Sequence, residues 1–146
     1  MQRGTTEIWR AWAPGVLKKV TVTATLAQKA SSSNTIVGFS NADATGVGGA
    51  GAIGAISSAS AASGAPTAAL ITTRDNSWVL GVGNDWDRAI ARSVGPAQTL
   101  LHQFLPTGDT YWVQRRTAPT PLSGTPVVIN DVVPVTIATT SRCAKF

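Results

Sequence analysis

The residues of this chain that could do chemistry are its one histidine, its one cysteine and a few aspartates in predicted loops. His102 stands in the string QTLLHQFL, where alternation along a strand would place it on one face with Leu100 and Phe104. Many serine hydrolases carry their nucleophile in a Gly-x-Ser-x-Gly elbow. This chain contains no such elbow and no other glycine-flanked nucleophile motif. The sequence therefore favours a structural histidine, with catalysis as the alternative.

Oxygen ligands for a hard cation gather in the string GNDWDR. Asp85 and Asp87 flank Trp86, and Asp109 stands in a second predicted loop. Carboxylate oxygens at the rim of a loop are typical Ca²⁺ ligands. The spacing lacks the regular pattern of an EF-hand, and Arg88 stands next to the acids as a neutralising charge, so loop acids that are solvated or cap turns are the competing interpretation.

A zinc site would need ligands from more than one copy of the chain. Zinc normally takes three or four histidine, cysteine or carboxylate ligands, and one chain supplies only His102 and Cys143 as nitrogen and sulfur donors. Cys143 is otherwise expected to be a free thiol. A site formed across a symmetric interface from His102 and an aspartate of each copy could activate water to cleave activated esters or phosphotriesters. A promiscuous metal-dependent hydrolase is therefore one alternative function.

The five tryptophans allow a third class of function, carbohydrate binding. Trp9 and Trp112 stand in alternating segments and are expected to belong to the core. Trp86 stands between two acids in a loop, so it is expected to be partly exposed. It is the candidate for stacking on a sugar ring.

The elements that must position these residues are short strands. Apolar and polar residues alternate in Thr110–Arg116 and in Val20–Leu26. Further strands bounded by Gly, Pro, Asn, Asp or Ser are expected at 5–12, 34–40, 52–57, 68–73, 77–83, 99–105 and 125–130. The one plausible helix, 85–93, is short enough to be a single turn. This pattern predicts an all-β fold, an antiparallel two-sheet sandwich of jelly-roll or immunoglobulin-like type.

The composition narrows the class of protein. A chain of 146 residues has the size of one domain, and its 13% of charged residues and single cysteine are typical of extracellular bacterial β-modules without disulfides. The net charge of +5 is scattered and not interleaved with stacking aromatic residues, which favours a solvated surface over nucleic-acid binding. No apolar run approaches the ~20 residues of a membrane span, and the amino terminus lacks a basic-then-apolar pattern, so we expect no signal peptide in the chain as given. We expect no membrane partner.

The strings GVGNDWD and GDTYWVQ resemble a β-sandwich module of unassigned function in large secreted proteins of soil bacteria, of acidobacterial type. The resemblance covers roughly residues 2–131. It implies a fold, an extracellular setting and a non-catalytic role in binding or architecture, without catalytic residues to carry over. The parent protein is expected to be secreted or at the cell surface, and the chain as given, without a signal, cytoplasmic when expressed.

Both ends of the chain depart from this resemblance. Family members have further strands before the QRGT string, so residues 1–131 are expected to form a truncated sandwich domain that lacks the family's first strands. The tail 132–146 is atypical, and one choice of codons for 135–146, read in another frame, gives DDRYNLAVCEI, which resembles the family's ending of the type DRYNLxxCEI. The sequence thus predicts a frameshifted tail. A sandwich without its first strands would expose strand edges and apolar surface, so we expect a homo-oligomer.

Overall fold

The computed structural model describes residues 6–61, 64–132 and 144–145, and the chain divides into two compact units. One unit is Trp9–Ile53, here called the small unit. The other, here called the sandwich unit, combines Met1–Ile8 with Gly54–Phe146.

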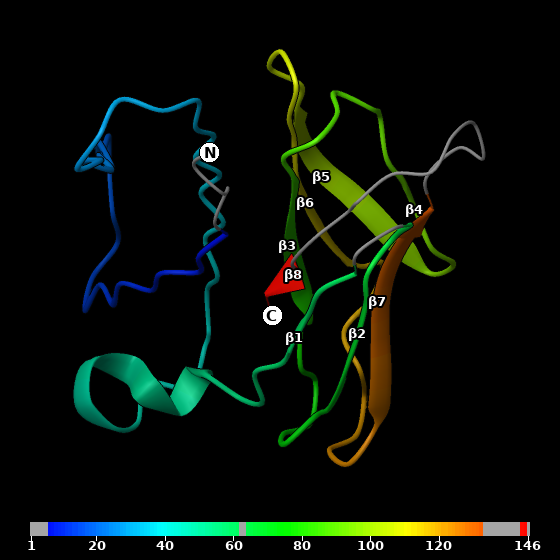
Figure 1. The fold of residues 1–146 in the computed structure, drawn as a ribbon. Helices are drawn as coiled ribbons and strands as arrows, with labels where there is room; N and C mark the ends of the chain where they lie inside the picture. Colours follow the sequence, from blue (N-terminus) through cyan, green and yellow to red (C-terminus); the bar gives the residue numbers. More distant parts are fainter. Residues whose placement is uncertain (1–5, 62–63, 133–143, 146) are drawn as a thin grey trace. The chain divides into compact units, whose positions relative to one another are not determined.

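The sandwich unit consists of two antiparallel sheets, which confirms the all-β, two-sheet fold (Figure 1). One sheet has the strand order β1-β8-β3-β6-β5 and the other the order β2-β7-β4. The strands are β1 (Ser58–Ala59), β2 (Thr67–Ile71), β3 (Leu80–Asp85), β4 (Ser93–Val94), β5 (Gln98–Phe104), β6 (Thr110–Arg116), β7 (Pro126–Val132) and β8 (Ala144–Lys145). The predicted strand 110–116 has the bounds of β6, and those predicted at 68–73, 77–83, 99–105 and 125–130 correspond to β2, β3, β5 and β7 with shifted ends.

A close approach between β3 and β6 depends on a glycine. Gly83 of β3 pairs with Trp112 of β6, and Trp112 is 3% exposed. A Cβ atom on Gly83 would overlap ring carbons Cζ2 and Cε2 of Trp112. The string GVGND therefore carries a glycine where the indole lies flat across the neighbouring strand.

The apolar core of the sandwich unit is small. Its buried cluster is made by Ala68, Val79, Val127 and Ile129, and the partly buried Ala59 and Leu70 pack against it. These residues come from β1, β2, β7 and the segment before β3. Much of the remaining space between the two sheets is filled by polar side chains, so hydrogen bonds and charge pairing must hold the sheets together there.

The small unit contains a short, kinked 3₁₀ segment. The 3₁₀ helix η1 (Val47–Ala52) has left-handed backbone at Gly48 and Gly49, which glycine adopts without strain. A Cβ on Gly49 would overlap the indole of Trp12, and the guanidinium of Arg10 donates a hydrogen bond to the carbonyl oxygen of Gly48 (2.5 Å). Within this unit the glycine-rich turn therefore closes against the aromatic segment that precedes it.

Four of the predicted strands are wrong, because the described residues of 5–12, 20–26, 34–40 and 52–57 contain no strand. An alternating segment becomes a strand only when a partner completes its ladder, and none of the described strands pairs with these segments. Their apolar side chains are largely exposed, and Trp9, expected in the core, is 85% exposed. The segment 52–57 starts at the last residue of η1, and the nearest strand, β1, begins at Ser58.

The segment 85–93 forms no helix. Asp85 is the last residue of β3, where it pairs with Thr110, and the following residues form bends before β4 begins at Ser93. The Thr110 hydroxyl donates to the carbonyl oxygen of Arg88 (2.8 Å) and accepts a hydrogen bond from the N–H of Ile90 (2.9 Å). These bonds to β6 use backbone groups that a helix would have paired internally.

Candidate functional site

The most polar part of the interior is built around Arg92, which lies just before β4 and is 3% exposed. Its guanidinium forms an ion pair with Asp85 of β3 through Nη2 and Oδ2, and a second with Asp131 of β7 through Nη1 and Oδ2 at 3.1 Å. Since β3 and β7 belong to different sheets, one cation ties the two sheets together. We call Arg92, Asp85 and Asp131 the charged triad.

An aromatic ring covers the cation of the charged triad. The guanidinium carbon of Arg92 lies 4.9 Å from the ring centroid of Trp112, a cation–π contact. The same indole lies across Gly83 of β3, the strand that pairs with β6. Trp112 therefore fixes the position of the guanidinium and excludes water from it.

Backbone hydrogen bonds to Asp85 and to β5 hold the loop that leads to Arg92. The N–H of Asp87 donates to Oδ1 of Asp85 (3.0 Å), while Oδ2 of that carboxylate pairs with Arg92. The backbone N–H of Arg92 donates to Oε1 of Gln103 on β5 (2.7 Å). Both oxygens of Asp85 are therefore occupied by the protein itself.

The charged triad carries one positive and two potential negative charges, and this affects Asp131. Burial raises the pKa of Asp131 above its ordinary value of 3.8, and the neighbouring carboxylate of Asp85 raises it further. The charge and the hydrogen bond of Arg92 act in the opposite direction without cancelling the effect of burial. The proton on Asp131 is thus held more strongly in the folded protein than in the unfolded chain.

A second, uncharged network lies further along β7. Gln98 of β5 donates from Nε2 to Oδ1 of Asn130 (2.7 Å) and accepts from the backbone N–H of Asn130 (3.2 Å). Gln114 of β6 donates from Nε2 to the carbonyl oxygen of Asn130 (3.2 Å) and to Oε1 of Gln98 (3.1 Å). Two glutamines of one sheet therefore satisfy the backbone of the other sheet, beyond the point where its pairing with β4 ends.

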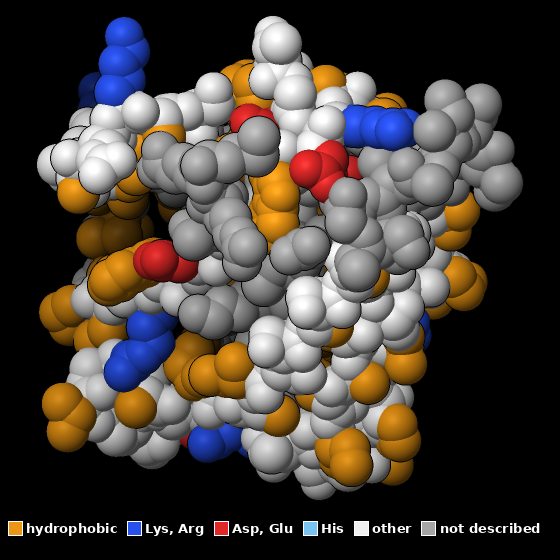
Figure 2. Space-filling model, in the orientation of Figure 1, with side chains coloured by type: hydrophobic (Ala, Val, Ile, Leu, Met, Phe, Trp, Pro, Cys, Tyr) orange, Lys and Arg blue, Asp and Glu red, His pale blue; other side chains and the backbone are white. Residues whose placement is uncertain are grey.

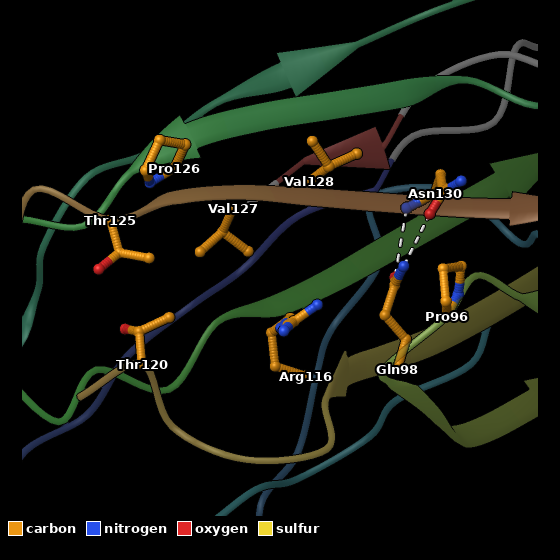
Figure 3. A pocket seen from close by; sticks show the side chains of 9 residues that line it. All are labelled: Pro96, Gln98, Arg116, Thr120, Thr125, Pro126, Val127, Val128 and Asn130. Carbon is orange, nitrogen blue, oxygen red and sulfur yellow. Dashed lines mark hydrogen bonds between the residues drawn. The ribbon is translucent and has the colours of Figure 1, made fainter. Parts of the chain in front are cut away.

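A hollow of about 250 Å³ opens next to this network, between the end of β6 and the start of β7 (Figure 3). We call it the end hollow. It is lined by Pro96, Gln98, Arg116, Thr120, Thr125, Pro126, Val127, Val128 and Asn130. Arg116 is half-buried and follows Trp112 and Gln114 in the row of β6 residues that faces the other sheet. Among the described residues no carboxylate forms an ion pair with Arg116, and its Nε is buried without a hydrogen bond.

The aspartates proposed as cation ligands do not come together. Asp85 lies in the charged triad instead of at a loop rim, and its neutralising partner is Arg92, not Arg88 as the sequence indicated. Asp87 is exposed, and Asp109 is half-buried beside Tyr111, whose pKa is raised by burial and by the charge of Asp109. Across the described part of the chain no three His, Cys, Asp or Glu residues are grouped closely enough to hold a metal ion.

His102 lies on the face of β5 opposite to that of Leu100, and on the same face as Phe104. An irregularity in the register between Leu100 and His102 reverses the alternation, so that Leu100 pairs with the buried Gln114 and His102 with Val113. His102 is exposed. The expectation that it shares a face with Leu100 is therefore wrong, while Phe104, on the same side as His102, stacks on Tyr111 with ring centroids 6.2 Å apart.

Trp86 and Cys143 are the two remaining candidates from the sequence. Trp86 is half-buried, in the loop between β3 and β4. Cys143 lies outside the described residues.

Sequence reasoning missed Arg92 and Asp131, although one signal pointed to them. Alternation along VVIND places Asp131 on the same face as Val127 and Ile129, which belong to the apolar core. A carboxylate at such a position requires a buried cation nearby, because burying an unpaired charge is costly. The chain offered several arginines for that role, and their distances became known only from the fold.

Comparison with known proteins found no family model, no curated protein and no solved structure that matches this chain. In the part of the chain that the structure describes, no helix combines the length and apolarity needed to cross a bilayer.

Proposed function

We propose that this chain is a non-catalytic β-sandwich module with a binding or structural role in an exported parent protein. The observation that carries the proposal is the use of the charged residues. The buried charged residues of the described interior pair with one another across the two sheets. They are Arg92, Asp85 and Asp131. A buried group with both oxygens paired is a structural element and not an accessible acid or base.

The remaining candidates for catalysis support the same proposal. His102 faces outward from β5, opposite Val113, and Asp87 is exposed in the loop after β3. A hydrolytic site needs a base, a bound water or nucleophile and a concave surface within hydrogen-bond reach of each other. The end hollow, the concave site at the end of the sheets, contains no histidine, cysteine or carboxylate in its lining.

Hydrolysis of activated substrates tests this proposal directly. We expect the purified chain to turn over 4-nitrophenyl acetate and an activated phosphotriester no faster than buffer with the same zinc concentration. His102→Ala is the informative variant, since an exposed side chain can be removed without loss of packing. Turnover that disappears in this variant or on chelation would replace the proposal by the metal-dependent hydrolase.

We also propose that the sandwich unit self-associates. Its apolar core is small, whereas large apolar side chains of several strands are exposed, among them Ile71 of β2, Phe104 of β5 and Val128 of β7. Apolar side chains are interspersed with polar ones on the visible face (Figure 2). Covering such surface is favourable by about 25 cal/mol per Å². Light scattering after size exclusion should give at least twice the mass of 15.0 kDa, and a monomer across the accessible concentration range would contradict self-association.

A further inference from the structure

We propose that the end hollow is a binding site for a small carboxylate with a compact apolar body, held by the guanidinium of Arg116. The proposal rests on the proposed function, since it gives the binding module a ligand class. It concerns a different part of the molecule from the charged triad, which has its own counter-ions.

The first argument is the charge balance inside the sandwich unit. Arg92 faces two carboxylates. Arg116 lies on β6, on the face that carries Trp112 and Gln114, and it faces no carboxylate in the described part of the chain. A half-buried guanidinium has lost part of its hydration, and the described residues give Arg116 no carboxylate in exchange. A planar cation in this state is well matched to a carboxylate, which it can bind through two parallel N–H donors.

The second argument is the set of additional polar groups in the end hollow. Asn130 directs its backbone N–H and carbonyl oxygen away from β2, to Gln98, Gln114 and Gly95. The backbone groups of alternate residues on a strand point to the same edge. The N–H and carbonyl oxygen of Val128 therefore also point away from β2. The hydroxyls of Thr120 and Thr125 donate their hydrogens to the carbonyl oxygens of Ser77 and Leu122, so they are not donors for a carboxylate, which only accepts hydrogen bonds. The donors that the end hollow offers to a carboxylate are therefore the guanidinium of Arg116 and the backbone N–H of Val128.

The third argument is the apolar part of the lining, which selects among anions. Val127, which is 3% exposed and belongs to the core, and Pro96 form a small aliphatic wall, while Pro126 and Val128 point from the opposite face of β7 (Figure 3). A phosphate or sulfate would gain nothing from this wall, whereas a branched or cyclic hydrocarbon would bury apolar surface against it. The volume of about 250 Å³ restricts the ligand to a small molecule. The lining thus favours a carboxylate with a short apolar body.

The test uses isobutyrate and its neutral isostere isobutyramide, titrated into the full chain and followed by amide NMR shifts. We expect isobutyrate to bind with a Kd of about 1–10 mM, and isobutyramide to bind at least about tenfold more weakly because it lacks the charge. The shifts should be confined to residues that line the end hollow. Equal affinity for the two probes, or no binding of isobutyrate, would overturn the proposal without requiring any variant to fold.

A pair of neighbouring variants provides the second test. Arg116→Met removes the cation of the end hollow, and we expect it to weaken isobutyrate at least about tenfold. Arg115→Met is the matched control, since it removes the same charge from the adjacent position, whose guanidinium stacks on Trp78 at 4.5 Å on the other side of β6. Isobutyrate affinity should stay within about twofold in the control. Equal loss in both variants would show a general charge effect and contradict the site.

Failure of this proposal and failure of the proposed function give different results. A chain that binds neither probe and shows no turnover would lose the carboxylate site but keep its non-catalytic role. A chain that turns over 4-nitrophenyl acetate through His102 would lose the non-catalytic role. The carboxylate titration would then still decide on the end hollow, whose lining does not include His102.

Discussion

Two arginines lie in the space between the sheets, and their surroundings are opposite. Arg92 is 3% exposed, pairs with Asp85 and Asp131 and lies against the face of Trp112. Arg116 is half-buried at the open end of the same space, and the described residues give it no carboxylate. The difference indicates that one end of the sandwich unit uses its charge for cohesion, while the other leaves a charge accessible to a ligand.

The largest expected effect comes from breaking the cohesive end. Arg92→Met leaves two buried carboxylates without their cation, which should lower the free energy of unfolding by about 3–5 kcal/mol. Since small domains are stable by about 5–15 kcal/mol, this change should bring the protein near the limit of folding. Urea unfolding followed by tryptophan fluorescence measures it, with Arg115→Met as a control that keeps the charged triad. A loss below about 1 kcal/mol would show that the triad does not hold the sheets together.

The second effect concerns the indole that covers Arg92. Gly83→Ala places a methyl group where Cζ2 and Cε2 of Trp112 now lie, so the ring and the guanidinium on its face must shift. Overpacking of this kind should cost about 1–3 kcal/mol. The control is Gly38→Ala, because a Cβ at Gly38 has no atom within 4 Å. Thermal unfolding of both variants, with near-UV circular dichroism for the indole environment, checks the prediction, and equal melting temperatures would refute the close approach.

The third effect separates the two carboxylates of the charged triad. Asp131→Asn keeps the volume and an acceptor for Arg92 and removes the like charge beside Asp85, so at neutral pH it should cost only about 1 kcal/mol or less. The more informative readout is the pH dependence. Because the pKa of Asp131 is raised in the folded state, its proton contributes stability that is present below pH 3.8 and is lost as the pH rises through the raised pKa.

The difference in unfolding free energy between the natural chain and the Asp131→Asn variant should therefore decline as the pH rises through this window and be flat above it. Comparing the two proteins cancels the contribution of the other carboxylates. A difference that grows with rising pH would mean that Arg92 lowers the pKa of Asp131 more than burial raises it.

The smallest effect on stability is expected at the other end. Arg116→Met removes a guanidinium that has no ion pair in the described structure, so unfolding free energy should change by no more than about 0.5 kcal/mol. Chemical denaturation at neutral pH measures this. A loss as large as that of Arg92→Met would show that Arg116 has a structural counter-ion, and the contrast between the two ends would not hold.

The regular strands of the sandwich unit were predictable, because their side chains alternate where the sheet has one buried face. The segment TYWVQRR gives β6 directly, since Trp112 and Gln114 face the other sheet. The segment VTVTATL has an equally clear pattern and forms no strand. Alternation is a property of the segment, whereas a strand also requires a partner ladder, which local sequence does not specify.

The site was less predictable than the fold. Asp85 was recognised as a chemically important residue, but its expected partner, Arg88, was the arginine nearest in sequence, and its actual partner is Arg92. The prediction that His102 shares a face with Leu100 was also wrong, although the one that it shares a face with Phe104 was right, because one irregularity at Leu101 reverses the alternation along β5. Side-chain partners across sheets and irregularities within strands depend on the register of distant segments.

By itself, the sequence determined the all-β class, most strands of the sandwich unit and the absence of a conventional catalytic motif, because these follow from local periodicity and residue type. Only the tertiary structure decided which charges meet. It brought Asp131 to Asp85 and Arg92, distant in sequence, and left Arg116 without a carboxylate among the described residues. The physical reason is that charge pairing depends on distances of a few ångströms between side chains of different sheets, which only the packing of the two sheets sets.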